Sequence, residues 1–256
     1  MGVLAQTWYE ERGSGEPLVL LHGGLSDARF FHANVGPLAE RFRVLTPDQR
    51  GHGRTPDVPG PFTFDAMADD TIAFIERVVG DPAHVAGHSN GAFIALLIAL
   101  RRPELVRRLV LVSGGFHRDG LISGAGEFDV DAAVEALAPS YGEVSPDYEE
   151  HFRVVVEKTA ALESTEPALA ASELRKVKVR TLVMFGDDDL VTIDHMATLY
   201  EGIPDSELAI VPGTSHFLLQ EKPGLCNKII LDFLSTDPIP TVAPVRRAQT
   251  TNGGSK

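Results

Sequence analysis

A serine placed between two glycines is the part of this sequence whose residue types most directly suggest chemistry. Residues 87–91 read Gly-His-Ser-Asn-Gly, the Gly-x-Ser-x-Gly pattern of a turn that lifts a serine hydroxyl from a strand end over a helix N-terminus. Glycine suits both flanks because the turn is sharp and a side chain there would crowd it. The spacing therefore predicts that Ser89 is a nucleophile.

A serine hydroxyl becomes an effective nucleophile when a neighbouring base removes its proton. Histidine titrates near neutrality and can be that base, while a carboxylate behind it fixes the tautomer and stabilises the imidazolium. The chain has nine histidines, and residues 187–189 are three consecutive aspartates. These aspartates lack the spacing of a calcium-binding loop. We interpret them as one candidate acid with two neighbours.

The elements around Ser89 are those that such a turn requires. The short apolar run 83–86 precedes it, and the segment 92–100 after it is apolar on nearly all sides, which predicts a buried strand followed by a buried helix. Apolar runs at 18–21 and 109–112 predict further central strands, and 8–12 predicts an edge strand. Alternating strands and helices predict an α/β fold with a mostly parallel, doubly wound sheet.

The strand pattern fades between residues 116 and 178, where acidic, alanine-rich segments predict helices near 127–137, 146–161 and 165–175. The strand pattern then returns. We therefore predict one core, formed by residues 1–115 and 179–236, with a helical insertion at 116–178. Residues 237–256 contain prolines, glycines and polar residues, and we expect a disordered tail there.

With these elements, the chain resembles the α/β-hydrolase fold superfamily over about residues 6–235. The resemblance rests on four motifs in the expected order, namely His22-Gly23-Gly24, Asp48-x-Arg50-Gly51-His52-Gly53, the turn at Ser89, and a late acid–histidine pair. The superfamily's chain order is nucleophile, acid, histidine. It implies a triad of Ser89, Asp189 and His216, with Asp187 as the alternative acid. Because each of these residues follows a parallel strand, we expect them to meet at one edge of the sheet.

The resemblance also implies how the site is completed. The backbone N–H groups of Gly24 and Asn90 are expected to form the oxyanion hole, and Asp48 and Arg50 are interpreted as loop braces. We expect His88 to point away from the site, since adjacent side chains diverge.

The insertion is expected to form a cap over Ser89, as in similar hydrolases. Some of its aromatic side chains are candidates for substrate contact, or else for the cap's own core. The residues proposed for substrate contact are Leu25, Phe116, Tyr141, Phe152 and Phe217.

Two positions depart from the family pattern. The N-terminus is short, so the first of the usual eight strands is in doubt. Arg180 stands where similar chains often carry proline.

The leading prediction is hydrolysis of a small ester, thioester, lactone or activated amide through an acyl-enzyme. A serine at the turn separates this chain from dehalogenases and epoxide hydrolases of the fold, which use aspartate. The same triad leaves open carbon–carbon bond hydrolysis or a lyase reaction, which usually needs cap arginines such as Arg118, Arg153 or Arg175. A non-catalytic ligand-binding protein and a cofactor-free haloperoxidase-like activity are further alternatives.

Composition restricts the partners that we expect. The net charge of −13 disfavours binding to nucleic acid or to an anionic membrane. Cys226 is the only cysteine, so neither an internal disulfide nor a thiolate zinc cluster can form. We read no signal peptide and no membrane span. We expect a cytoplasmic enzyme with a small-molecule substrate, no cofactor and no metal; the oligomeric state stays open.

Overall fold

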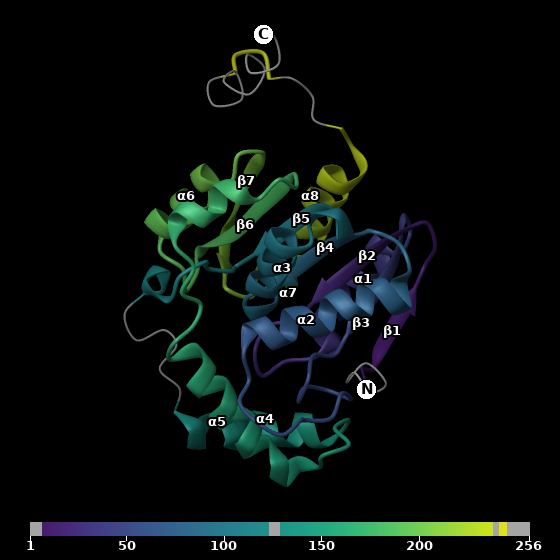
Figure 1. The fold of residues 1–256 in the computed structure, drawn as a ribbon, viewed down its shortest axis with the longest axis vertical. Helices are drawn as coiled ribbons and strands as arrows, with labels where there is room; N and C mark the ends of the chain where they lie inside the picture. Colours follow the sequence, from purple (N-terminus) through teal and green to yellow (C-terminus); the bar gives the residue numbers. More distant parts are fainter. Residues whose placement is uncertain (1–6, 123–128, 238–240, 245–256) are drawn as a thin grey trace.

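A seven-stranded sheet with helices on both faces forms the centre of the molecule (Figure 1). The computed structural model describes residues 7–122, 129–237 and 241–244. The strands within those residues are β1 Tyr9–Arg12, β2 Glu16–Leu21, β3 Phe42–Pro47, β4 Ala83–His88, β5 Val106–Val112, β6 Thr181–Asp188 and β7 Ser206–Ser215.

The helices cover both faces of this sheet and extend beyond one end of it. They are α1 His32–Leu38, α2 Phe64–Phe74, α3 Asn90–Arg101, α4 Val130–Gly142, α5 Phe152–Glu163, α6 Ile193–Gly202, α7 Leu218–Glu221 and α8 Pro223–Ser235. A π-helical segment, Ile75–Val79, continues α2, and short 3-10 turns lie at Ala28–Phe31, Pro103–Leu105, Arg118–Gly120, Glu149–His151 and Ala171–Lys176.

The strand order is β1-β3-β2-β4-β5-β6-β7. β1 pairs antiparallel with β3 at one edge, and every other pair is parallel. The predicted mostly parallel, doubly wound sheet and the predicted edge strand are both confirmed. In the described residues the sheet has seven strands.

The core consists of two apolar layers, one on each face of the sheet. Successive strand residues point to opposite faces: Val19 and Leu21 of β2 join the layer under α2 and α3, while Leu18 and Leu20 join the layer under α1 and α8. Full burial of each such side chain contributes about 1.5–3 kcal/mol. Helices are therefore needed on both faces, as continuous apolar runs in the strands predict.

Helices α4 and α5 lie apart from the sheet, at the lower end of Figure 1. They belong to the segment predicted as an insertion, and we call them the cap helices. The third helix expected there, near 165–175, is instead the short 3-10 turn Ala171–Lys176. Pro167 lies inside the predicted range and has no N–H to continue a helix.

The chain carries Arg180 immediately before β6, where similar chains often have proline. Its guanidinium donates to Glu207 at 2.6 Å and lies 4.6 Å from the centre of the Phe233 ring. This arginine therefore ties the start of β6 to β7 and α8.

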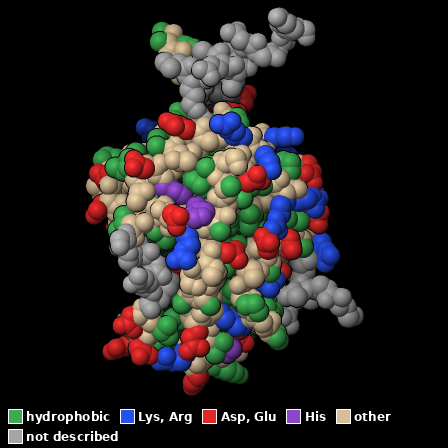
Figure 2. Space-filling view, turned by 60° about the vertical axis from the view of Figure 1, so that its left-hand side comes forward, with side chains coloured by type: hydrophobic (Ala, Val, Ile, Leu, Met, Phe, Trp, Pro, Cys, Tyr) green, Lys and Arg blue, Asp and Glu red, His purple; other side chains and the backbone are tan. Residues whose placement is uncertain are grey.

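On the face in Figure 2, acidic and basic side chains are interspersed. Within the described residues, every helix is too short or too polar to cross a membrane. Most of the tail predicted at 237–256 lies outside the described residues.

Candidate active site

Ser89 occupies the turn between β4 and α3. Its backbone has φ 55° and ψ −122°, a left-handed φ that non-glycine residues rarely adopt and that marks a strained turn. A Cβ added at Gly87 would collide with the carbonyl of Gly91, and one added at Gly91 would collide with that of Leu21. Both glycines of the motif are therefore required by close backbone packing.

The helix after this turn is held firmly in the core. Residues 91–99 of α3 are all buried, as predicted from their apolar sequence, and the N–H of Ser89 donates to Val112 of β5 at 2.9 Å. The position of Ser89 is consequently set by two strands and a buried helix.

Asp189 and His216 form a hydrogen-bonded pair. His216 Nδ1 lies 2.9 Å from Asp189 Oδ1, and the hydroxyl of Ser113 donates to Asp189 Oδ2 at 2.5 Å. Burial alone would raise the pKa of Asp189, but the hydrogen bonds from His216 and Ser113 outweigh it and leave that pKa below its usual value. The carboxylate is thus ionised and orients the imidazole.

The neighbouring aspartate has a different environment. Asp187 is exposed and accepts a hydrogen bond from the N–H of Thr214 at 3.1 Å, so it shapes the end of β7. Of the two aspartates considered for the acid, the structure therefore brings Asp189 to His216.

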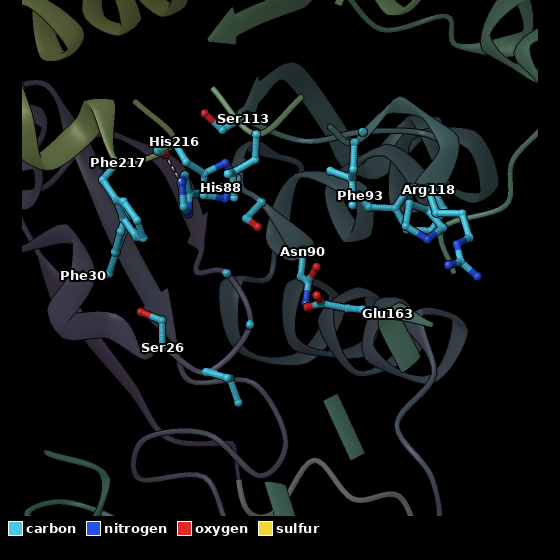
Figure 3. Close-up of a pocket in the computed structure, with 18 of the residues that line it drawn as sticks. Ser26, Phe30, His88, Asn90, Phe93, Ser113, Arg118, Glu163, His216 and Phe217 are labelled. Atoms are coloured by element: carbon cyan, nitrogen blue, oxygen red, sulfur yellow. Dashed lines mark hydrogen bonds between the residues drawn. The ribbon is translucent and has the colours of Figure 1, made fainter. Parts of the chain in front are cut away.

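A cavity of about 480 Å³ connects the predicted groups, and both Ser89 and His216 line it. Figure 3 shows His216 beside Ser113 and His88 in this pocket. In the described part of the chain, the Ser89 hydroxyl and the His216 imidazole share the lining without a hydrogen bond between them. Catalytic hydrogen bonds are often long in the absence of substrate.

Gly24 and Asn90, the predicted oxyanion-hole residues, also line the cavity. Asn90 is the first residue of α3, so its N–H has no acceptor within the helix. A Cβ at Gly24 would lie 2.6 Å from the Asn90 side chain, which explains why glycine stands there. These positions suit two backbone donors aimed at a substrate oxygen.

The predicted substrate contacts fall into two groups. Leu25 and Phe217 line the cavity, and Phe217 is 49% exposed. The lining does not include Phe116, Tyr141 or Phe152, all of which are buried in the core. Tyr141 of α4 and Phe152 pack with ring centres 4.8 Å apart. The latter three side chains fit the cap-core alternative given for them.

His88 lies closer to the site than expected. It lines the cavity instead of pointing away, stacks on Phe30 at 4.4 Å between ring centres, and its Nε2 lies 2.8 Å from the carbonyl of His216. Burial lowers the pKa of His88 to about 3, so the ring is neutral and its Nε2–H donates to that carbonyl. The one feature of the sequence that could have indicated this position is that His88 directly precedes Ser89.

Asp48 and Arg50 brace loops, as predicted. The buried Asp48 carboxylate accepts from the N–H groups of Ala28 and Arg54, each at 2.8 Å. Arg50 donates to Asp70 of α2 at 2.6 Å. The bond to Ala28 connects the loop after β3 with the segment that follows Gly24, and the bond to Asp70 connects it with α2.

One contact near Ser89 had no counterpart in the sequence-based predictions. The side chain of Asn90 donates to Glu163, the last residue of α5, at 2.7 Å. Glu163 lines the cavity, and burial raises the pKa of its carboxyl, although the Asn90 hydrogen bond opposes that change. Nothing in the local sequence of α5 distinguishes this glutamate from its exposed neighbours.

The site contains no evident cluster for a metal. Across the ranges that the structure describes, no group of three or more histidine, cysteine, aspartate or glutamate side chains is arranged to hold an ion.

Comparison with known proteins identifies the family. The model of the alpha/beta hydrolase family matches residues 18–229. The chain belongs to this family, in agreement with its sheet topology and with the resemblance inferred from its motifs.

Individual relatives are similar along nearly their whole length. RutD of Azorhizobium caulinodans, a candidate carbamate hydrolase, is 29% identical over 251 residues, covering 90% of this chain and 95% of that protein. BpoC of Mycobacterium tuberculosis, a candidate non-heme bromoperoxidase, is 28% identical over 255 residues, covering 89% and 97%. The enol-lactonase of Burkholderia xenovorans LB400 superposes with a TM-score of 0.73 at 23% identity, covering 90% and 96%; this likeness shows the fold alone.

Proposed function

We propose that this protein is a serine hydrolase that cleaves a small ester, thioester, lactone or activated amide through an acyl-enzyme. Ser89 is the nucleophile, His216 the general base, and Asp189 the group that orients and stabilises the imidazole. The N–H groups of Gly24 and Asn90 bind the oxyanion of the tetrahedral intermediate.

The reaction follows from these roles. His216 Nε2 takes the proton of Ser89 as its oxygen attacks the carbonyl carbon, and then gives that proton to the leaving group. Water then attacks the acyl carbon as it loses a proton to the same nitrogen, the ester bond to Ser89 breaks to release the acid, and the proton passes from His216 to the Ser89 oxygen. The ionised Asp189 carboxylate, 2.9 Å from His216 Nδ1, holds the imidazole with Nε2 free to accept.

The observation that carries the proposal is the Asp189–His216 pair opening into the same cavity as a serine on a strained turn. The cavity volume of about 480 Å³ favours a small-molecule substrate. The names of RutD and BpoC indicate two different reactions. They therefore do not identify the substrate of this protein, and we infer the substrate class from the cavity.

The test is hydrolysis of p-nitrophenyl acetate together with fluorophosphonate labelling. We expect the wild type to turn over the ester and to be labelled, and Ser89→Ala to lose both. Exposed Ser164 of the cap gives the control, because Ser164→Ala removes a serine hydroxyl outside the cavity and should change neither result. Labelling that persists in Ser89→Ala would contradict the assignment of the nucleophile.

A second candidate, hydrolysis of a carbon–carbon bond, is favoured by one observation. Arg118 lines the cavity and could bind a substrate carboxylate, whereas Arg153 donates to Asp131 on the surface. Turnover of a vinylogous 1,5-diketo acid, faster than turnover of simple esters and lost in Arg118→Gln, would favour this reaction over ester hydrolysis.

A further inference from the structure

A carboxyl group from the cap reaches the residue that follows the proposed nucleophile. Glu163 ends α5, and its Oε1 accepts the 2.7 Å hydrogen bond from the side chain of Asn90. Figure 3 shows the two side chains meeting at the cavity. Residues 73 positions apart in the sequence are thereby joined beside Ser89.

Glu163 also lies against the second half of the proposed oxyanion hole. A Cβ built on Gly24 would be 3.0 Å from Glu163 Oε1, so the carboxyl group lies over the backbone that flanks the reacting carbonyl. Among the described residues, its other oxygen has no hydrogen-bond partner. That oxygen is available to a ligand in the cavity.

A carboxylate in this position has an electrostatic consequence. The oxyanion that forms during acyl transfer would be repelled by a nearby negative charge in a partly buried site. The raised pKa of the Glu163 carboxyl reflects the same difficulty of holding a charge there. A substrate that brings an N–H group to this carboxyl would relieve the repulsion and supply the missing hydrogen bond.

We propose that Glu163 selects substrates with an N–H donor one or two bonds from the scissile carbonyl, such as amino-acyl esters or carbamates. This inference rests on the proposed serine hydrolase function. The other charged or titratable side chains that line the cavity are Arg118, His88, His117 and His216, and none of these side chain types carries a negative charge in any protonation state. Glu163 is therefore the carboxyl that the cavity lining offers to such a group.

The experiment compares matched substrates on wild type and Glu163→Gln. Ethyl glycinate and ethyl propionate differ by an ammonium in place of a methyl group, and ethyl carbamate and ethyl acetate differ by an uncharged amino group in place of a methyl. The glutamine oxygen can still accept from Asn90, but its amide nitrogen replaces the free carboxylate oxygen. Glu157→Gln, at an exposed position of the same helix, is the control.

We expect Glu163→Gln to lower kcat/KM for ethyl glycinate about tenfold or more relative to ethyl propionate, the effect of losing one charge-assisted hydrogen bond. Glu157→Gln should leave that ratio unchanged. A matching fall for ethyl carbamate relative to ethyl acetate would show that an uncharged N–H is sufficient, and no fall would restrict the preference to amines. The same compounds, scored as inhibitors of p-nitrophenyl acetate hydrolysis, extend the comparison to slow substrates.

Two results would overturn the inference and leave the proposed function intact. Equal losses for ethyl glycinate and ethyl propionate would mean that Glu163 only positions Asn90. Unchanged ratios in both pairs, with fluorophosphonate labelling of Ser89 retained, would mean that the carboxyl does not meet the substrate. Absence of labelling and of all turnover in the wild type would instead remove the proposed function, and this inference with it.

Discussion

The turn at Ser89 and the cap helices meet at one cavity but differ in how they are attached to the sheet. The turn is built into the sheet, with residues 91–99 of α3 all buried behind it. The cap helices pack side chains such as Tyr141 and Val155 into the apolar layer on one face of the sheet, and they add polar contacts, including those of Lys158 and His151 with Asp57 at 2.6 and 2.9 Å. The difference suggests that the sheet fixes the reacting groups, whereas the cap supplies selectivity.

A second set of polar contacts joins the cap to the segment after β2. Arg29, after the loop that carries Gly24, donates to Glu143 at 2.8 Å and to the carbonyl of Ser140 at 2.7 Å. Arg29 and Glu143 are both partly solvent-exposed, and exposed ion pairs contribute little to stability. Because the sheet holds the proposed reacting groups and the cap contributes other residues to the cavity lining, we expect substitutions on the sheet side to affect all substrates alike. Substitutions on the cap side should change mainly which substrates react.

The largest effect is expected for the acid on the sheet side. Asp189→Asn preserves the shape of the side chain but cannot stabilise the imidazolium and favours the wrong tautomer, so kcat should fall about 10⁴-fold for every ester. Steady-state kinetics on p-nitrophenyl acetate and on ethyl propionate measures this. Asp187→Asn, at the exposed neighbouring aspartate, is the matched control and should retain most activity. Equal losses in the two variants would contradict the assignment of Asp189.

A smaller effect, on stability, is expected at Asp48, the buried carboxyl that accepts a hydrogen bond from Ala28 in the segment after Gly24. Burial outweighs the backbone hydrogen bonds to Asp48 and raises the pKa of its carboxyl from 3.8 to about 6. Between about pH 4 and pH 6 the folded state therefore holds a proton that the unfolded state has lost. The contribution of Asp48 to the free energy of unfolding is full below about pH 4 and falls by about 3 kcal/mol as pH rises past 6.

Denaturant titrations of wild type and Asp48→Asn between pH 4.5 and pH 7.5 measure this contribution. The stability difference between the two proteins should shift in favour of the variant as pH rises, because asparagine does not titrate. Any constant cost of placing an amide against the N–H groups of Ala28 and Arg54 cancels in this comparison. Parallel pH profiles would show that the carboxyl titrates normally.

The smallest effect is expected where the cap is attached. Asp57→Asn weakens the hydrogen bonds from Lys158 and His151 and should lower the free energy of unfolding by about 1.5–3 kcal/mol, the range for hydrogen bonds to charged groups. Because Lys158 and Glu163 share α5, the preference for ethyl glycinate should weaken more than turnover of ethyl propionate. Chemical unfolding and the two ester assays test both parts.

Equal reductions in the turnover of the two esters by Asp57→Asn would contradict the expectation that the cap controls mainly which substrates react. Exposed Glu157 again provides the control, since Glu157→Gln alters a charge on the same helix without a contact to the core.

Local patterns were sufficient to predict the sheet side of the site. The Gly-x-Ser-x-Gly turn, the apolar strand before it and the apolar helix after it are contiguous, and each was read from spacing alone. The edge strand was predicted in the same way, whereas the two braces, Asp48 and Arg50, were interpreted from the family resemblance. The histidine and the acid came from chain order, because parallel strands bring their carboxyl ends to one edge.

What the sequence determined by itself is therefore the class of fold and the residues that could react, since periodicity and turn chemistry act over a few neighbouring positions. The tertiary structure decided which groups meet. Ser113 reaches Asp189 across 76 residues, and Asn90 reaches Glu163 across 73. Such contacts depend on how strands and cap helices pack, and no local pattern marks a helical glutamate as the one that faces the cavity.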